Sequence, residues 1–525
     1  MTHQSSTYVI QEIRDFVPVA LRPWILIAFL LVFQICSGAY MAVASQMASA
    51  TALLREDIMM AGYANLVGMM LVFTLMYRLK FRFSIKTSLI VCSLACALCC
   101  IICVHTTSVP LLVFTNFVLG LFRMWGTFAC NTTIQLWITP KRDMAVWFCY
   151  IYLVVQLFIQ LSGLTSVYIT FYTQWEYMHY FIIALLFAVA LLTQVLFRHY
   201  RSMPKLPLFG IDWMGGILWG AAVMSAVFVL VYGEYYDWFD SPAIWTGTCF
   251  AIVCVVLNVW RASFIRHPFI ENRVWKYRNV WLTFVLYILV DLLISPSHIF
   301  EYILAETILG YDAAHVVSLS IPVVVGIVVG AVVCYQCFAL RHWKYKTMTT
   351  IGFSFILVYL LFMYFGIDYN VDKEMLYLPI FMRALGYEIL AIVFLTALTQ
   401  VPFPTFFQSL SVQAMMSACL GALVGETMLH EVFKHVHQSN VLQLGSTLDA
   451  VNTQLQGLPF DKVYGSLQQY SLLVSMKEVY GWLCYLGIAT VLACLLYYSS
   501  LRPGTIYPKF STIRKRVKRQ LRKEL

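Results

Sequence analysis

Residues 87–105 read TSLIVCSLACALCCIICVH and contain no aspartate, glutamate, lysine or arginine. A helix of about 20 mainly apolar residues is long enough to cross the hydrocarbon core of a bilayer. Basic residues precede the run at Arg82 and Lys86, and the next apolar run begins near residue 109. The stretch therefore predicts a membrane-spanning helix with a short connection on either side.

The rest of the chain follows the same pattern. Of its 525 residues, 61% are hydrophobic and 11% are charged, against about 45–50% and about 25% in soluble proteins. The composition excludes soluble enzymes, nucleic-acid-binding proteins and secreted disulfide scaffolds. Apolar runs of spanning length occupy residues 22–45, 60–77, 87–105, 109–135, 144–169, 176–197, 213–232, 243–262, 279–300, 313–339, 347–366, 375–399, 405–430 and 478–500. These fourteen runs predict an all-α polytopic membrane protein.

Charged residues in the connections predict the orientation. One side carries bases, namely Arg78, Lys80, Arg82 and Lys86, then Lys141 and Arg142, then Arg198, Arg201 and Lys205, then Arg261, Arg266, Arg273, Lys276 and Arg278, then Arg341, Lys344 and Lys346. The other side carries acids, namely Glu234, Asp237 and Asp240, then Glu301, Glu306 and Asp312, then Asp368, Asp372 and Glu374. Because basic loops stay in the cytoplasm, we expect both termini to be cytoplasmic in a multi-pass protein of the plasma (inner) membrane.

Three segments outside the spans have their own signals. Segment 501–525 holds nine basic residues and the single acid Glu524. It therefore contributes most of the formal charge of +10. It predicts a cytoplasmic tail that contacts lipid headgroups, with nucleic-acid binding as the weaker alternative. Segment 1–21, with Ile13, Phe16 and Val17, predicts a short helix on the membrane surface. The outer connection 435–477 has leucines at helical spacing and predicts a helical hairpin, with a disordered loop as the alternative.

No pattern predicts a disulfide, a metal site or a cofactor. The fifteen cysteines lie in apolar runs, where a thiol is an ordinary small core residue. His430 and His435 are five residues apart, whereas a zinc-protease helix needs histidines four apart.

Four stretches carry a resemblance to a known family. They are IDWMGG at 211–216, DWFDSP at 237–242, RHPFI at 266–270 followed by Tyr277-Arg278-Asn279, and Leu309-Gly310-Tyr311 followed by Ile321-Pro322 and the glycines 326 and 330. In this order they resemble the fourteen-helix drug:proton antiporter branch of the major facilitator superfamily, the EmrB/QacA type.

The resemblance implies a domain organisation and a function. It implies a six-helix bundle at 22–200, two extra helices at 201–265, a second six-helix bundle at 266–500 and transport by rocking about a central site. It also implies export of small molecules against protons and, in an envelope with two membranes, a periplasmic adaptor and an outer-membrane channel as partners. The chain departs from the family in its fifth predicted helix, where Gln156 and Gln160 stand in place of the family's Gly-Pro signature. Such amides can bind substrate or join helices.

Ionisable residues deep in the predicted helices are candidates for proton coupling, because lipid tolerates them only beside a cavity or a partner. Asp291 lies about 18 Å from the start of its helix, and Ser295 and His298 follow on the same face. A desolvated carboxyl is suited to loading and releasing a proton near neutral pH. Glu388 and Glu426 are the further candidates. The alternative for each is a helix-to-helix hydrogen bond or, for Glu426 near the outer end, simple solvation.

Two arginines are candidates for the substrate cavity or for coupling. Arg123 shares one side of its helix with Asn131, and the resemblance links its position to proton movement. A structural pair with a carboxylate is the alternative. Arg383, with Tyr387, precedes Glu388 by five residues, so the two charges face different directions.

These observations favour a proton-coupled exporter of amphiphilic or aromatic small molecules that works by alternating access. The first alternative is an exporter of an endogenous lipid, pigment or metabolite without proton coupling, which the departure at Gln156 and Gln160 favours. A membrane-embedded lipid enzyme is the remote alternative, because the polar residues form no nucleophile, base and acid cluster.

Overall fold

A computed structural model of the chain describes residues 9–200, 205–368, 371–446 and 459–496, and every regular element in these ranges is a helix. Thirteen helical segments are long and apolar enough to cross a membrane. Helix α1 (Arg22–Ala42), with 21 residues, is a further helix of spanning length. The prediction of an all-α polytopic membrane protein is therefore confirmed for the described residues. Thirteen of the fourteen predicted spans coincide with these segments, and α1 coincides with the remaining run at 22–45.

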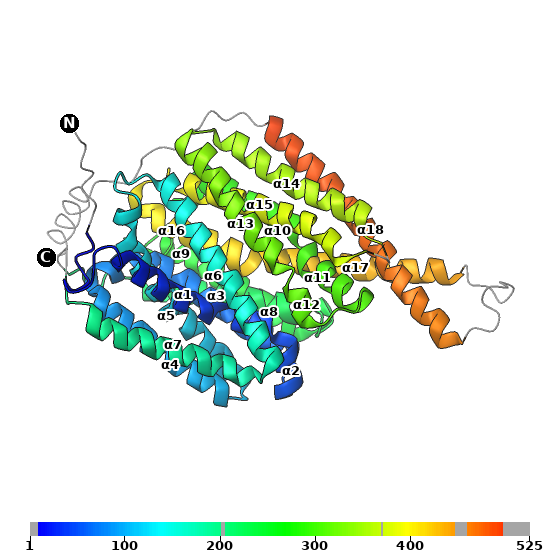
Figure 1. Cartoon of the computed structure of the whole chain (residues 1–525), viewed down its shortest axis with the longest axis horizontal. Coiled ribbons are helices and arrows are strands. Elements are labelled where there is room, and N and C mark those ends of the chain that lie inside the picture. The colour runs from blue at the N-terminus through cyan, green and yellow to red at the C-terminus, as the bar shows by residue number, and fades with distance from the viewer. Residues whose placement is uncertain (1–8, 201–204, 369–370, 447–458, 497–525) are drawn as a thin grey trace. The chain divides into compact units, whose positions relative to one another are not determined.

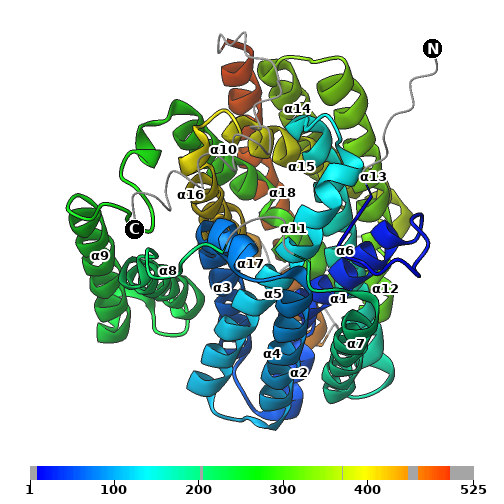
Figure 2. The ribbon, with the colours of Figure 1, turned by 90° about the vertical axis from the view of Figure 1, so that its left-hand side faces the viewer.

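The described chain divides into two compact units. Unit 1 comprises Met1–Val285 and Phe394–Leu420, apart from the residues left undescribed. Its further elements are α2 (Ala44–Thr51), α3 (Arg55–Arg82), α4 (Ile85–His105), α5 (Val109–Ile138), α6 (Met144–Tyr172), α7 (Trp175–Leu196), α8 (Trp213–Tyr232), η1 (Trp238–Asp240), α9 (Pro242–Ala262), η2 (Val274–Lys276), α16 (Phe403–Ala414) and η6 (Met415–Leu420). Within this unit α8 packs on both α9 and α3 (Figure 2).

Close approach of two backbones organises the centre of unit 1. A Cβ atom added at Gly120 of α5 would lie 1.9 Å from the main-chain oxygen of Asn65 in α3. Only glycine fits there, as is common where membrane helices pack tightly. Side-chain caps fix several helix starts: Asp143 accepts from the amide of Ala145 at the start of α6, and Asp212 accepts from that of Gly215 at the start of α8.

Unit 2 comprises Leu286–Val393 and the described part of Gly421–Arg502. Its elements are α11 (Pro296–Tyr302), η3 (Ile303–Ile308), α12 (Ala313–Val317), α13 (Ser320–Val333), η4 (Cys334–Leu340), α14 (Tyr345–Gly366), η5 (Lys373–Leu376), α17 (Gly421–Ser446) and α18 (Phe460–Leu496). Helices α10 (Arg278–Ile294) and α15 (Tyr377–Leu398) contribute residues to both units. The division into bundles 22–200 and 266–500 with two extra helices at 201–265 remains a prediction.

The predicted connection 435–477 contains two paired helical segments in the described residues. Segment Asp461–Leu496 of α18 has 36 residues, about 54 Å of helix against about 30 Å of hydrocarbon. Its first turns pair with the end of α17, where the amide of Asn440 donates to Ser475 Oγ at 3.0 Å. His437 and Gln468 make a second polar contact at 3.2 Å. Figure 1 shows these ends of α17 and α18 running on beyond the other helices of unit 2.

The predicted surface helix in segment 1–21 is wrong for the described residues. Residues 9–21 form turns, and Ile13 makes an isolated antiparallel bridge with Phe197 at the end of α7. The amide of Arg198 donates to the main-chain oxygen of Glu12 at 3.0 Å. The segment is not helical because its main-chain groups find partners at the end of α7 instead.

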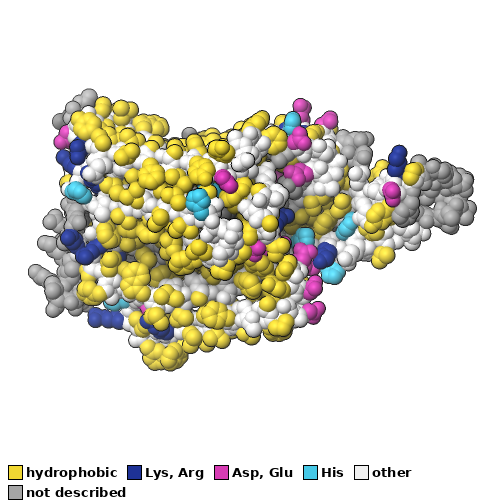
Figure 3. Space-filling view, turned by 90° about the horizontal axis from the view of Figure 1, so that it is seen from below, with side chains coloured by type: hydrophobic (Ala, Val, Ile, Leu, Met, Phe, Trp, Pro, Cys, Tyr) yellow, Lys and Arg dark blue, Asp and Glu magenta, His cyan; other side chains and the backbone are white. Residues whose placement is uncertain are grey.

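The exposed surface fits contact with lipid. Helix α9 exposes a row of large apolar side chains: Trp245, Phe250, Ile252, Val253, Val256, Leu257, Val259 and Trp260. Most side chains on the face drawn in Figure 3 are hydrophobic. The predicted basic tail, 501–525, lies outside the described residues.

Candidate functional site

The path from α10 to α11 breaks beside the first candidate site. Pro296 has no amide hydrogen to donate to the carbonyl of Leu292, one turn earlier. The hydroxyl of Ser295 donates to that carbonyl at 2.7 Å instead. The break is therefore satisfied locally by a side chain, and the helix continues on its far side.

Asp291 lies in the last turn of α10, just before this break. It is 7% exposed, and its Oδ2 atom is buried without a hydrogen-bond partner. Helix α17 comes close here, because a Cβ atom added at Gly425 would lie 3.0 Å from the main-chain oxygen of Asp291. The next residue, Glu426, is near enough to act on the Asp291 carboxyl electrostatically. The sequence therefore placed Asp291 correctly in the interior, and the fold adds a second acid.

Glu426 connects Asp291 with a more exposed group. Its Oε1 lies 3.4 Å from Nδ1 of His298 in α11, and the two side chains are 22% and 54% exposed. Asp291, Glu426 and His298 thus form one cluster, which runs from a buried carboxyl to a partly exposed imidazole. The sequence placed Glu426 and His298 on different helices, and only the structure shows that they pair.

A second polar cluster in unit 2 surrounds Arg383 of α15. Its Nη2 lies 3.4 Å from Oε2 of Glu301, and the two side chains are 14% and 10% exposed. The hydroxyl of Tyr359 donates to the other oxygen of Glu301 at 3.0 Å. The Arg383 guanidinium also lies over the Tyr359 ring, 5.7 Å from its centre. The hydroxyl of Tyr480 in α18 completes the cluster at 3.4 Å from that of Tyr359.

The cluster corrects two predictions about the outer acids. Glu301 was expected in an outer connection, but it lies in α11 and is 8% exposed. Glu306, expected in the same connection, lies in the π-helical segment η3. The helix runs past the predicted end at residue 300, and Arg383 compensates the buried charge of Glu301. The sequence did contain a signal that Glu301 belongs to the helix. It follows His298 by three residues, which places the two side chains on nearby faces of one helix.

Glu388 stands apart from both clusters. It lies in α15 with 0% exposure, and neither carboxyl oxygen has a hydrogen-bond partner. It packs against Gly330 of α13. Arg383 pairs with Glu301 and not with Glu388, so the expectation that the two charges face different directions agrees with the structure. Tyr387 is half-buried on the same helix.

Arg123 is one of the buried charged residues of unit 1. It lies in the middle of α5 with 2% exposure, and its Nε and Nη1 atoms have no hydrogen-bond partner. Its Nη2 lies 3.0 Å from the thioether sulfur of Met69, and the thiols of Cys36 and Cys96 are also near. None of the ion pairs among the described residues includes Arg123.

Polar side chains near the Arg123 face of α5 differ in their hydrogen bonding. Thr127, one turn on, accepts a hydrogen bond from the amide of Gln34 in α1 at 3.2 Å. Asn131 is 9% exposed, and its Oδ1 atom has no hydrogen-bond partner. The two amide side chains singled out in α6, Gln156 and Gln160, are half-buried.

The described part of the chain holds no group of three or more His, Cys, Asp or Glu side chains arranged to bind a metal ion. The fifteen cysteines all lie in the described ranges, where none of them forms a disulfide, and most of them are buried.

Sequence comparison gives no relative. No family model matches the chain, and no curated protein matches it. Among solved structures, a peptide transporter POT in complex with sulfate is 13% identical, with a TM-score of 0.58 over 92% of this chain and 96% of that one. The nucleoside transporter NupG is 11% identical, with a TM-score of 0.51 over 91% and 100% of the two chains. The human organic anion transporter MFSD10 is 9% identical, with a TM-score of 0.51 over 89% and 98%.

These similarities reach across nearly the whole chain at low identity, so they concern the fold. They do not single out the drug-antiporter branch. The protein is an all-α polytopic membrane protein with the fold of the major facilitator transporters.

Proposed function

We propose that this protein is a secondary active transporter that exports amphiphilic or aromatic small molecules across the plasma (inner) membrane in exchange for protons. The observation that carries the proposal is the cluster of Asp291, Glu426 and His298 within unit 2. A membrane protein rarely keeps ionisable groups in its interior unless they serve a substrate, an ion or a proton.

The cluster suggests how a proton moves. His298 is exposed enough to exchange a proton with water, and its ring lies 3.4 Å from Glu426. Glu426 acts in turn on Asp291, whose Oδ2 has no other partner. A proton passes along this series by acid-base exchange, and the buried carboxyl of Asp291 is the end of the path.

The helix break gives the proton a way to act on the conformation. The Ser295–Pro296 break lies directly after Asp291, and interrupted helices are common at the sites of secondary transporters. A change in the charge of Asp291 changes its interaction with α17 at Gly425, where the two backbones nearly touch. We propose that this contact couples protonation to alternating access, and that Arg123, Asn131, Gln156 and Gln160 contribute to substrate binding or coupling in unit 1.

The partners and the orientation belong to the same proposal. Both termini are cytoplasmic in it, which puts the α17–α18 hairpin outside. In an envelope with two membranes, a periplasmic adaptor and an outer-membrane channel would meet the transporter there.

The test is Asp291→Asn in purified protein reconstituted into vesicles with an imposed pH gradient. We expect the variant to lose gradient-driven export of a fluorescent amphiphilic dye but to retain exchange of dye across the vesicle membrane without a gradient. Retained exchange shows that the variant folds and binds. Asp312→Asn is the matched control, because Asp312 is an exposed acid of the same unit. Full gradient-driven export in Asp291→Asn would contradict the proposal. A wild-type protein that transports one narrow substrate without any gradient would favour the uncoupled exporter of a lipid, pigment or metabolite.

A further inference from the structure

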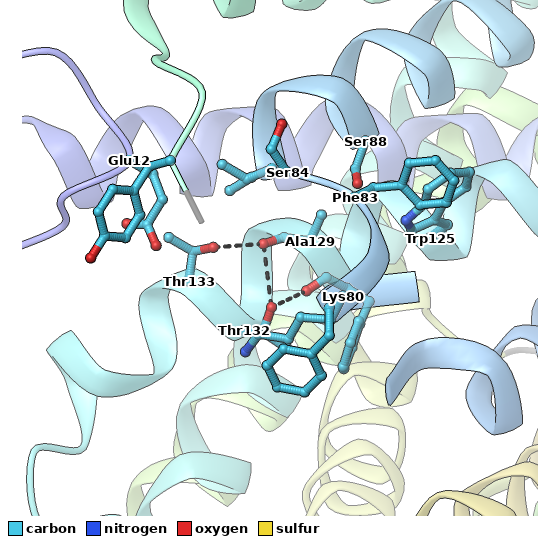
Figure 4. Close-up of a pocket in the computed structure, with 13 residues that line it drawn as sticks. Glu12, Lys80, Phe83, Ser84, Ser88, Trp125, Ala129, Thr132 and Thr133 are labelled. Carbon is cyan, nitrogen blue, oxygen red and sulfur yellow. Dashed lines mark hydrogen bonds between the residues drawn. The ribbon is translucent and has the colours of Figure 1, made fainter. Parts of the chain in front are cut away.

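A pocket opens at the end of unit 1 where the N-terminal segment lies. It is lined by that segment, by the junction of α3 and α4, and by one face of α5 (Figure 4). Water can enter a volume of about 70 Å³ in it, and the pocket is open to the outside. Glu12 and Lys80 are its charged lining residues, and they have opposite signs.

The fold holds Glu12 in the pocket wall. The main-chain oxygen of Glu12 accepts from the amide of Arg198 at 3.0 Å, and the next residue, Ile13, makes the bridge to Phe197. The buried guanidinium of Arg22 donates to the main-chain oxygen of Ile10 at 2.8 Å. The segment is therefore pinned on both sides of Glu12, and this carboxyl is part of a built wall.

The two charges of the pocket have not paired with each other. Oε2 of Glu12 is buried without a hydrogen-bond partner, and no ion pair joins Glu12 to Lys80 in the described chain. Burial raises the pKa of the Glu12 carboxyl, and hydrogen bonding to the main-chain amides of Glu12 and Gln11, together with the charges of Lys80 and Arg198, partly opposes that rise. A buried carboxylate oxygen without a partner is unfavourable, so a ligand that donates a hydrogen bond to it gains affinity.

The uncharged walls define what the ligand can be. Thr132 and Thr133 donate their hydroxyl hydrogens to carbonyl oxygens of their own helix, both at 2.9 Å, so their oxygens can only accept further bonds. Figure 4 shows Thr133 on the side of the pocket where Glu12 lies. Trp125 and Phe83 form an aromatic wall, with ring centres 5.2 Å apart. Hydrogen-bond acceptors and aromatic faces together favour an ammonium group.

We infer that this pocket binds a zwitterionic group, whose ammonium donates to Glu12 and whose phosphate or carboxylate contacts Lys80. Two sources supply this chemistry: the ethanolamine headgroup of a membrane phospholipid, and a free amino acid. The inference does not depend on the proposed transport, since it concerns binding to the resting protein.

The test measures binding to the full-length protein in a detergent free of such groups. The probes are lysophosphatidylethanolamine, lysophosphatidylcholine with the same chain, glycerophosphoethanolamine and phenylalanine, and the readout is calorimetric affinity. We expect lysophosphatidylethanolamine to bind about 10-fold or more tightly than the choline lipid, because a trimethylammonium group cannot donate a hydrogen bond. Glu12→Gln should weaken the binding by about 10- to 100-fold.

Control variants separate the site from general charge effects. Lys80→Gln should weaken binding only a few-fold, because Lys80 is exposed, and it tests the site without disturbing the N-terminal segment. Glu176→Gln and Lys141→Gln remove charges of unit 1 that do not line the pocket, and they should leave the affinity unchanged.

Each pattern of binding decides between the sources or against the site. Binding of the lysolipid alone, lost in Glu12→Gln, supports the lipid headgroup. Binding of phenylalanine or glycerophosphoethanolamine, lost in the same variant, supports a soluble ligand. Absence of binding by every probe, or equal binding in the wild type, Glu12→Gln and Lys80→Gln, would overturn the inference.

Discussion

Two arginines, Arg383 in unit 2 and the more deeply buried Arg123 in unit 1, have opposite surroundings. Arg383 in unit 2 has a carboxylate at 3.4 Å and an aromatic face beneath its guanidinium. Arg123 in unit 1 has a thioether sulfur at 3.0 Å and two nitrogen atoms without any partner. The same type of side chain therefore has a carboxylate partner in one unit and no ion-pair partner among the described residues in the other.

The difference distinguishes an arginine that holds helices together from one that is available for binding or coupling. A buried ion pair with satisfied hydrogen bonds holds helices together, and its loss leaves an isolated charge. An isolated buried charge opposes folding, so its retention favours a role in binding or coupling. We therefore expect Arg383 to matter most for stability and Arg123 to matter most for activity.

The largest effect is expected when the Arg383 pair is broken. Arg383→Met leaves the carboxylate of Glu301 buried with the Tyr359 hydroxyl as its remaining hydrogen-bond donor, and we expect the free energy of unfolding to fall by about 3–5 kcal/mol. Denaturation of the purified protein in mixed micelles measures the loss. The double variant Glu301→Gln/Arg383→Met should be more stable than Arg383→Met alone. Additive losses in the double variant would mean that the two residues are not coupled.

A change of opposite sign is expected at Arg123. Arg123→Met removes an uncompensated charge and keeps an unbranched chain beside Met69, so we expect the free energy of unfolding to rise by about 1–4 kcal/mol. Gradient-driven transport in vesicles should be lost in the same variant. The contrast between the two arginines would fail if Arg123→Met destabilised the protein as much as Arg383→Met.

The smallest effect is expected at Glu12. Its carboxyl forms no ion pair in the described chain, whereas that of Glu301 pairs with Arg383. Burial raises the pKa of Glu12 above its usual value of 4.5, so the folded state binds this proton more tightly than the unfolded state. The resulting stability is fully present below pH 4.5 and is lost as the pH rises through the folded-state pKa. The melting temperature of the wild type should therefore fall with rising pH more than that of Glu12→Gln. Glu176→Gln should follow the wild type, and parallel curves for the wild type and Glu12→Gln would contradict the expected shift.

Of the two polar clusters in unit 2, sequence reasoning identified Asp291, Glu426 and Arg383 as candidate residues. The depth of Asp291 followed from counting residues along an apolar run, because a helix rises by a fixed distance per residue. Glu301 was missed because the predicted helix ended one residue too early. Tyr359 and Tyr480 were missed for a different reason, since nothing distinguishes them in sequence among 32 tyrosines.

The sequence by itself determined that the chain is an all-α membrane protein and where its apolar runs lie along the chain. Insertion depends on the hydrophobicity of a local stretch, so the fourteen runs could be read one at a time. Only the tertiary structure decided that Glu301 meets Arg383, that Glu426 meets His298, and that Arg123 meets no carboxylate. These outcomes depend on how each helix is rotated and packed against helices far away in the chain. A charge can be recognised in sequence, but its partner is chosen by packing.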